Sequence, residues 1–97
     1  MNLVWSEPAE EDLDAIVEYI AQDNLQAALD MDSLLRDTAD RLILFPEKGK
    51  PGRIPGTREL IVHKNYILVY VTTPETVQIV TVLHSARQWP PTEHSNQ

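Results

Sequence analysis

The sequence predicts an α+β fold, in which an α-helical hairpin packs on one face of an antiparallel sheet of three to four strands. In the first half, apolar residues repeat every three or four positions, whereas from Thr57 onward the chain consists of β-branched and aromatic runs. Ninety-seven residues, 42% of them hydrophobic, suffice for one core. The expected element order is β-α-α-β-β-β, in a single domain over residues 1–91 followed by a disordered polar tail over residues 92–97.

The first helix is predicted to follow a short apolar strand over residues 2–5. Ser6 and Pro8 supply the chemistry of a helix start, and the acidic residues just after them suit the positive end of the helix dipole. One apolar stripe is predicted, at Ala9, Leu13, Ile16, Val17 and Ile20.

The second helix is expected to follow at once, since Asp23 and Asn24 offer N-cap chemistry. Its apolar stripe is predicted at Ala28, Met31, Leu35, Ala39, Leu42 and Phe45. Pro46 and Gly49 then end the helix, and the stretch PEKGKPGRIPG is predicted to be loop because it holds three prolines and three glycines in eleven residues. The short link between the helices predicts an antiparallel hairpin.

Three strands are predicted after the loop, in the runs TRELIVH, YILVYVT and TVQIVTVLH. Their short connections indicate antiparallel pairing, with the N-terminal strand added at an edge or in the middle of the sheet. The last two runs offer apolar side chains to both faces, although a sheet covered on one side usually alternates apolar and polar residues. The sheet face without helices is therefore expected to bind a partner, or to be covered by a loop or a homodimer contact.

The charge is distributed unevenly along the chain. The net charge of -7 argues against nucleic-acid binding, but residues 1–47 hold 12 acidic and 2 basic side chains, whereas residues 48–97 hold 3 acidic and 6 basic ones. The second half therefore forms a locally basic surface, or its charges serve solvation alone. The cations concerned are Lys48, Lys50, Arg53, Arg58, Lys64 and Arg87.

Other function classes find little support in the composition. The chain has no cysteine, no signal-peptide pattern and no apolar run of the roughly 20 residues that cross a bilayer, which predicts a cytoplasmic protein without a membrane partner. His63, His84 and His94 lack metal-site spacing, so no metal and no cofactor is expected. The Gly52–Gly56 stretch lacks the Gly-Lys-Ser/Thr ending of a phosphate-binding loop.

The residues GRIPGTREL, YILVY and VLHSARQWP, in that order after a helical hairpin, resemble the RelE/ParE superfamily of bacterial toxins from type II toxin–antitoxin modules. The resemblance covers residues 2–90. It implies a small toxin with the RelE/ParE-like fold, neutralised by a cognate antitoxin, ParD-like or other, whose C-terminal segment wraps the toxin in a hetero-oligomer.

This superfamily contains two chemistries. RelE-like members are ribonucleases that cut messenger RNA in the ribosome, and ParE-like members are gyrase poisons. The nucleases carry the pattern Tyr-Arg-Leu-Val-Tyr in the third strand, whereas the pattern here is YILVY, with Ile67 in place of the phosphate-stabilising arginine. Losing such a contact costs roughly 2–4 kcal/mol of transition-state stabilisation. Together with the ending VLHSAR, this favours a growth inhibitor that acts on DNA gyrase; the alternative is a metal-independent mRNA endoribonuclease of the RelE type, ribosome-dependent or free.

The candidate site residues follow from these two alternatives. His84 is suited to acid–base chemistry near neutral pH, or its ring nitrogen fixes the C-terminal turn. Trp89 either packs as a lid or offers a stacking platform to a nucleobase. Arg58 and Glu59 are neighbours on a strand and point to opposite faces, so Arg58 is expected to face a carboxylate at the rim of the helices. The nuclease hypothesis makes four residues catalytic: His84, Arg87, Arg58 and Arg53. The expected target or antitoxin contacts are Lys50, Arg53, Arg58, Tyr66, His84, Arg87 and Trp89.

Overall fold

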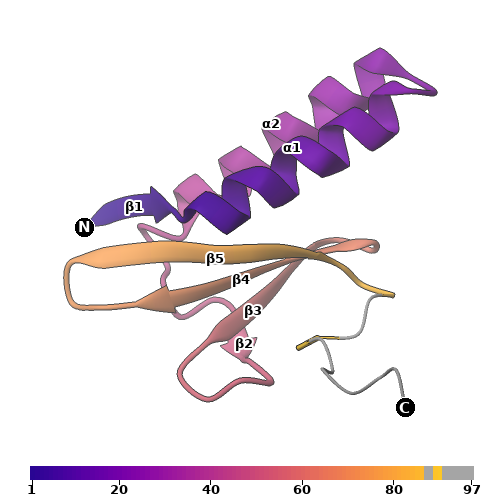
Figure 1. The fold of residues 1–97 in the computed structure, drawn as a ribbon. Coiled ribbons are helices and arrows are strands. Elements are labelled where there is room, and N and C mark those ends of the chain that lie inside the picture. Colours follow the sequence, from indigo (N-terminus) through magenta and orange to yellow (C-terminus); the bar gives the residue numbers. More distant parts are fainter. Residues whose placement is uncertain (87–88, 91–97) are drawn as a thin grey trace, which may run out of the picture.

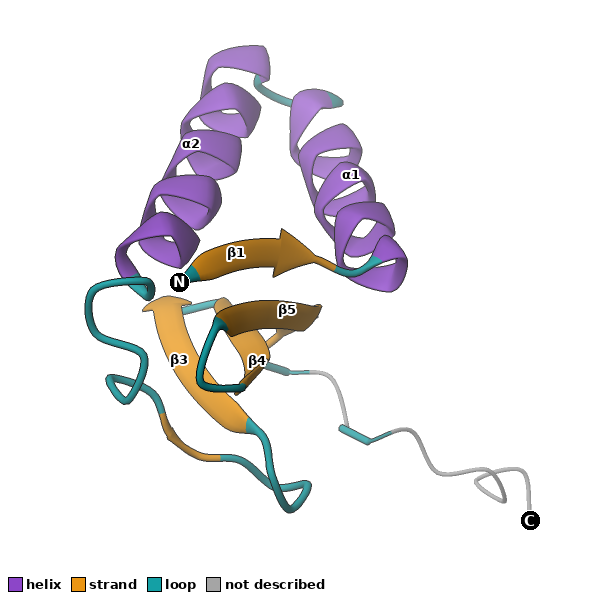
Figure 2. Ribbon diagram, turned by 90° about the vertical axis from the view of Figure 1, so that its left-hand side faces the viewer, coloured by secondary structure: helices purple, strands orange, loops and turns teal. Residues whose placement is uncertain are grey.

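The computed structural model describes residues 1–86 and 89–90. Two layers are visible in Figure 1, a helical hairpin and a sheet, and the view in Figure 2 shows both helices on the same side of the sheet. The predicted α+β class is confirmed. Arg87 and the tail over residues 92–97 lie outside the described residues, so the predictions made for them remain predictions.

Both helices begin where the capping residues place them. Helix α1 covers Glu7–Ala21, and the hydroxyl of Ser6 accepts a hydrogen bond from the backbone N–H of Ala9 at 3.1 Å. Helix α2 covers Leu25–Arg41, and the side-chain oxygen of Asn24 accepts from the N–H of Ala27 at 3.0 Å. The predicted apolar stripes face the core, and six of their residues are fully buried: Ala9, Leu13, Ala28, Leu35, Ala39 and Leu42.

Phe45 departs from its predicted position in the stripe of α2. The helix ends at Arg41, and a turn follows in which the N–H of Phe45 still donates to the carbonyl of Arg41 at 3.2 Å. Pro46 disfavours helical backbone at the residue before it, so the chain leaves the helix axis here. The Phe45 side chain is consequently 62% exposed, and its assignment to the core was wrong.

The sheet has five strands in the order β1-β5-β4-β3-β2. The bounds of β3 (Arg58–His63), β4 (Tyr66–Thr72) and β5 (Thr76–His84) match the three predicted runs to within one residue, and their antiparallel pairing is confirmed. Strand β1 (Asn2–Trp5) lies at one edge and runs parallel to β5, so the sheet is mixed and not antiparallel throughout. The two strands are far apart in the chain, with the helical hairpin and strands β2 to β4 between them, which leaves room for a parallel pairing.

A short fifth strand, β2 (Lys50–Pro51), was not predicted. It lies within the proline- and glycine-rich stretch and pairs antiparallel with the start of β3. The N–H of Gly52 donates to the carbonyl of Thr57 at 2.8 Å, which extends the pairing into the connecting loop. The prediction of loop over the whole stretch was therefore wrong for two residues, because the chain doubles back on β3 and finds backbone partners there.

The two faces of the sheet carry separate apolar clusters. We call the face toward the helices the inner face, and its buried residues include Tyr66, Leu68, Tyr70, Val77, Ile79 and Val82. On the opposite, outer face, Ile67, Val69 and Leu83 are buried with Val80 and Trp89 packed against them. The interpretation of Trp89 as a lid is confirmed. Ile61, opposite Ile67 on the neighbouring strand, remains 61% exposed, so this face is only partly covered.

Candidate functional site

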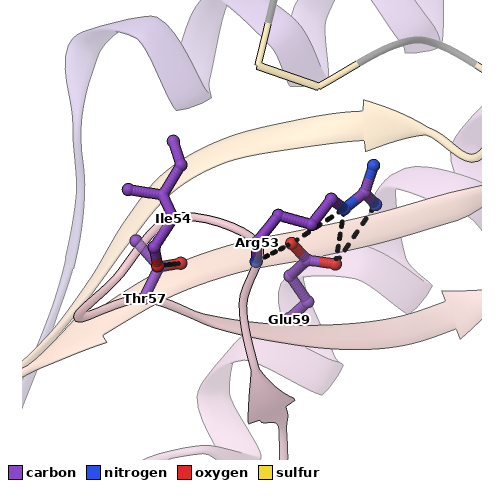
Figure 3. A network of polar contacts seen from close by, with 4 residues as sticks. All are labelled: Arg53, Ile54, Thr57 and Glu59. Atoms are coloured by element: carbon purple, nitrogen blue, oxygen red, sulfur yellow. Dashed lines mark hydrogen bonds and ion pairs between the residues drawn. The ribbon is translucent and has the colours of Figure 1, made fainter.

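The outer face carries an ion pair between Arg53 and Glu59. Glu59 lies opposite Val69 in the pairing of β3 with β4, so its side chain points to the outer face, where it is only 2% exposed. Figure 3 shows Arg53 folded back over this carboxylate. Its Nε lies 3.1 Å from Oε2, its Nη2 lies 3.1 Å from Oε1, and its backbone N–H donates to Oε2 at 3.0 Å.

The protonation of Glu59 reflects this arrangement. Burial by itself works to raise the pKa of the carboxyl group, but the backbone N–H and the guanidinium of Arg53 outweigh it, with a smaller contribution from Lys50. The pKa of Glu59 is therefore held below its ordinary value. The loop that delivers Arg53 is itself closed by Thr57, whose hydroxyl donates to the carbonyl of Ile54 at 2.7 Å (Figure 3).

A second polar group fixes the segment that leaves α2. The hydroxyl of Tyr70 donates to the carbonyl of Pro46 at 2.8 Å and accepts from the N–H of Gly49 at 2.9 Å. Burial raises the pKa of Tyr70, in spite of the Gly49 N–H and the charge of Arg58, which act in the opposite direction. A side chain at Gly49 is excluded, because its Cβ would lie 2.7 Å from the Tyr70 hydroxyl oxygen.

Arg58 belongs to the same group. Its Nη1 donates to the carbonyl oxygens of Gly49 at 2.7 Å and of Glu47 at 3.4 Å. The predicted carboxylate partner at the rim of the helices was thus wrong: backbone carbonyls take its place, because the loop passes directly beside β3. Arg58 fixes the loop that Tyr70 also holds.

A cleft of about 610 Å³ lies between the helices and the end of the sheet. Its lining comes from α1, from Met31 of α2, from the β3–β4 turn and from the end of β5. Tyr66 forms part of its wall, with the ring of His84 at 5.4 Å in an edge-on arrangement and the ring of His63 at 6.4 Å. Burial raises the pKa of Tyr66, and the nearby Tyr19 hydroxyl adds to that shift.

The His84 side chain has the structural role that was one of its two interpretations. Its Nδ1 accepts a hydrogen bond from the N–H of Ala86 at 3.1 Å, which ties down the turn after β5. His63 repeats this arrangement with the N–H of Asn65 at 3.3 Å. In the neutral ring the proton then resides on Nε2, so that nitrogen is a donor.

The predicted site residues are divided between the two faces. Arg53 and Trp89 lie on the outer face, whereas Arg58, Tyr66 and His84 lie on the inner side. The last two are brought together, since Tyr66 pairs with His84 across β4 and β5. Lys50 is exposed on β2. The structure therefore brings Tyr66 and His84 together and separates them from Arg53.

Two interactions that join the layers were missed by the sequence analysis. Asp12 of α1 accepts hydrogen bonds from the N–H of Val82, at 3.1 Å, and from the hydroxyl of Thr81. Arg36 of α2 pairs with Glu10 at 3.4 Å and lies 5.5 Å above the ring of Trp5. Both acids belong to a helix rich in carboxylates, and nothing in the sequence distinguishes them from their solvated neighbours. Glu59 was detectable, because strand alternation places it on the same face as the apolar Ile61.

Neither a metal cluster nor a membrane span is found in the part of the chain that the structure describes. No three histidine, aspartate or glutamate side chains gather there in a way that holds a metal ion. None of the helices described is long and apolar enough to cross a bilayer.

Solved structures share this α+β architecture. A chain of the chromosomal ParDE toxin–antitoxin system of Pseudomonas aeruginosa superimposes with a TM-score of 0.76 at 24% identity, over 87% of this chain and 95% of that one. The YoeB dimer of Staphylococcus aureus gives 0.60 at 14% identity, over 87% and 95% of the two chains. These likenesses establish the fold.

The family follows from the sequence comparisons. The model of the ParE toxin of the type II toxin–antitoxin system, parDE, matches residues 3–89, so the chain belongs to this family. The Y4kP protein of Sinorhizobium fredii is 35% identical over 86 residues, which are 89% of this chain and 90% of that one. Toxin RelE2 of Caulobacter vibrioides is 38% identical over 86 residues, 89% and 97% of the two chains. The chain is a toxin of a type II system, whose partner is an antitoxin.

Proposed function

We propose that this toxin inhibits bacterial growth by binding DNA gyrase in the cytoplasm, and that a ParD-like antitoxin neutralises it there. The observation that carries the proposal is the separation of the residues that a metal-independent ribonuclease would use. Such an enzyme needs a base, an acid and cations around one phosphate, and misplacement by even an ångström costs much of the rate. Here Arg53 lies on the outer face, whereas His84 and Arg58 lie on the inner side beside opposite ends of β4, next to Tyr66 and Tyr70. This separation favours an inhibitor that acts by binding.

Position 67 supports the proposal most directly. Ile67 is 7% exposed and belongs to the outer-face cluster with Val69, Leu83 and Trp89. A cation at this place would lie in apolar surroundings, where an unpaired charge is costly. The strand position that carries the phosphate-binding arginine in the nuclease pattern is used here for packing.

The remaining arginines are engaged elsewhere. The guanidinium of Arg53 pairs with the buried carboxylate of Glu59. This ion pair would have to break before the guanidinium could bind a phosphate with all its donors. Arg58 donates to two backbone carbonyls below the loop after α2. Neither cation is preorganised toward a common point with His84, although preorganisation is what makes such groups effective in catalysis.

Induced expression in a sensitive bacterium tests the proposal. We expect filamentation and DNA-damage signalling while the transcripts remain intact in the same time course. In a direct assay with purified gyrase, we expect the toxin to alter supercoiling, and the antitoxin to abolish the effect. Early transcript cleavage with translation arrest and no DNA-damage signal would contradict the proposal.

A metal-independent mRNA endoribonuclease is the second candidate. His84 favours it, because its ring is exposed at the edge of the cleft and its Nε2 is a potential proton donor. The name of the relative from Caulobacter vibrioides, RelE2, points in the same direction. Under this hypothesis His84→Ala would abolish transcript cleavage with little change in folding stability, whereas the gyrase hypothesis leaves transcripts intact with either protein.

A further inference from the structure

Leu44 and Phe45 are two adjacent, exposed apolar residues that follow the end of α2. The two adjacent side chains are 73% and 62% exposed, and both follow the last residue of the helix, Arg41, within a tight turn. Exposed large apolar side chains side by side are a feature of interaction surfaces. We use the name knob for these two residues.

The knob is held rigidly from below. The segment behind it is fixed at three backbone positions, since the Tyr70 hydroxyl binds Pro46 and Gly49 while Arg58 binds Gly49 and Glu47. The N–H of Lys48 also donates to the carbonyl of Phe45 at 3.1 Å. A side chain whose backbone is already ordered loses less entropy on binding, so such a residue makes an effective anchor.

The cleft offers a complementary surface. Most of its wall is apolar, from Ile16, Ile20, Met31, Tyr66 and Val82. Its volume of about 610 Å³ exceeds what one aromatic and one aliphatic side chain require.

Charge supports the same match. Residues 41–50 around the knob carry three cations and one carboxylate, Glu47. The rim of the cleft is acidic along α1, where Asp12 lines it and Glu11 and Glu18 flank Ala15 one helical turn away on either side; Lys64 stands on the opposite rim. A basic knob and an acidic rim attract each other, whereas two copies of the chain otherwise repel each other through their net negative charge.

We propose that the knob of one copy inserts into the cleft of a second copy, so that the free toxin self-associates head to tail. The knob cannot reach the cleft of its own chain, because it follows the end of α2, which is about 25 Å long, whereas the cleft is lined by Tyr19 and Ile20 near the end of α1 and by Met31 near the start of α2. The contact joins two different surfaces and is therefore heterologous, which leaves a free knob and a free cleft at the ends of every assembly. The proposed self-association does not depend on whether the target is gyrase or RNA.

Complementation between two variants tests this geometry. Phe45→Ala removes the knob and keeps the cleft, whereas Ala15→Arg blocks the exposed rim of the cleft and keeps the knob. In sedimentation velocity on the purified full chain, from micromolar to millimolar concentration, the wild type should form assemblies that grow with concentration. Each variant alone should weaken association by about tenfold or more, and their mixture should stop at a dimer of one copy of each.

A third variant serves as the control. Leu29→Ala removes another half-exposed leucine from α2 and should associate as the wild type does. Equal melting temperatures would show that all three variants are folded. A wild type that stays monomeric throughout, variants that still associate as the wild type does, or a mixture without the mixed dimer would each overturn the proposal.

Discussion

Individual polar side chains in this toxin are fixed by ion pairs and hydrogen bonds at the faces of the sheet. Glu59 is the clearest case, a carboxylate buried on the outer face with Arg53 as its counter-ion. An isolated buried charge is strongly unfavourable, so each member of the pair makes the other tolerable. Removing Arg53 is therefore expected to lower the free energy of unfolding by more than the partial exposure of its side chain would suggest.

Arg53→Ala should lower the free energy of unfolding by about 1–3 kcal/mol at pH 7, since it leaves the Glu59 carboxylate buried without its cation. The range is at the low end for buried pairs because the Arg53 side chain is 43% exposed. Glu59→Gln is the matched comparison, since it keeps the shape and an acceptor for the Arg53 N–H. Urea denaturation measures both variants, and an unchanged midpoint for Arg53→Ala would contradict the assignment.

The same pair makes a pH-dependent contribution. Because the pKa of Glu59 in the folded protein lies below its ordinary value of 4.5, its stabilisation is fully present above that value and is lost as the pH falls through the folded pKa. The difference in unfolding free energy between wild type and Glu59→Gln should therefore narrow only in the acid range below pH 4.5. If this difference in unfolding free energy already narrowed between pH 7 and pH 5, another titrating group would be responsible for the pH dependence.

Tyr70→Phe should destabilise the fold by about 1–3 kcal/mol, because the N–H of Gly49 and the carbonyl of Pro46 both lose their partner. Tyr66→Phe is the matched control. Its ring is buried in the same inner-face cluster, and its hydroxyl makes no hydrogen bond with the residues that the structure describes. Chemical denaturation of both variants tests the difference, and equal losses would reduce the Tyr70 hydroxyl to a packing role.

At the scale of elements, the helical hairpin is attached to the sheet mainly through α1 and β5. Strand β5 shifts register against β4 near Val69 and Tyr70, and Asp12 of α1 accepts hydrogen bonds from Thr81 and Val82 just beyond the shift. The Asp12 carboxylate of α1 thus accepts hydrogen bonds from polar groups of β5 at the point where the pairing of the strands is irregular.

Asp12→Ala should accelerate hydrogen exchange at the Val82 amide and lower the free energy of unfolding by about 1–3 kcal/mol, since it removes the acceptor for that N–H. Asp14→Ala changes an exposed carboxylate on the same helix and should do neither. Unaltered exchange at Val82 in Asp12→Ala would show that the strand does not depend on this contact.

For the whole molecule, the division of charge along the chain becomes a division in space. The acidic first half is mainly the helical layer, and the basic residues of the second half that the structure describes lie in the loop after α2, in β2 and β3, in the loop between them, and in the turn after β3 (Figure 2). A partner meets an acidic surface on one side and a locally basic one on the other, which directs its orientation during encounter. The proposed self-association draws on this polarity.

Most of the fold is predictable from local sequence. The helix starts follow from Ser6 and Asn24, the apolar period of 3.6 defines the helices, and runs of β-branched and aromatic residues define the three long strands. These features depend on residues close together in the chain. The parallel edge strand β1, the short strand β2 and the exposure of Phe45 depend on how distant segments meet, and local patterns carry no such information.

The candidate site shows the same division. The sequence by itself determined the fold class, the Ile67 substitution in the YILVY pattern, the uneven charge and the residue types available for chemistry. Only the tertiary structure decided that Arg53 is paired with Glu59, that Arg58 holds a loop, and that His84 shares a cleft with Tyr66 on the other side of the sheet. The physical reason is that charges and hydrogen-bonding groups act over a few ångströms in space, and chain folding alone sets which of them come that close.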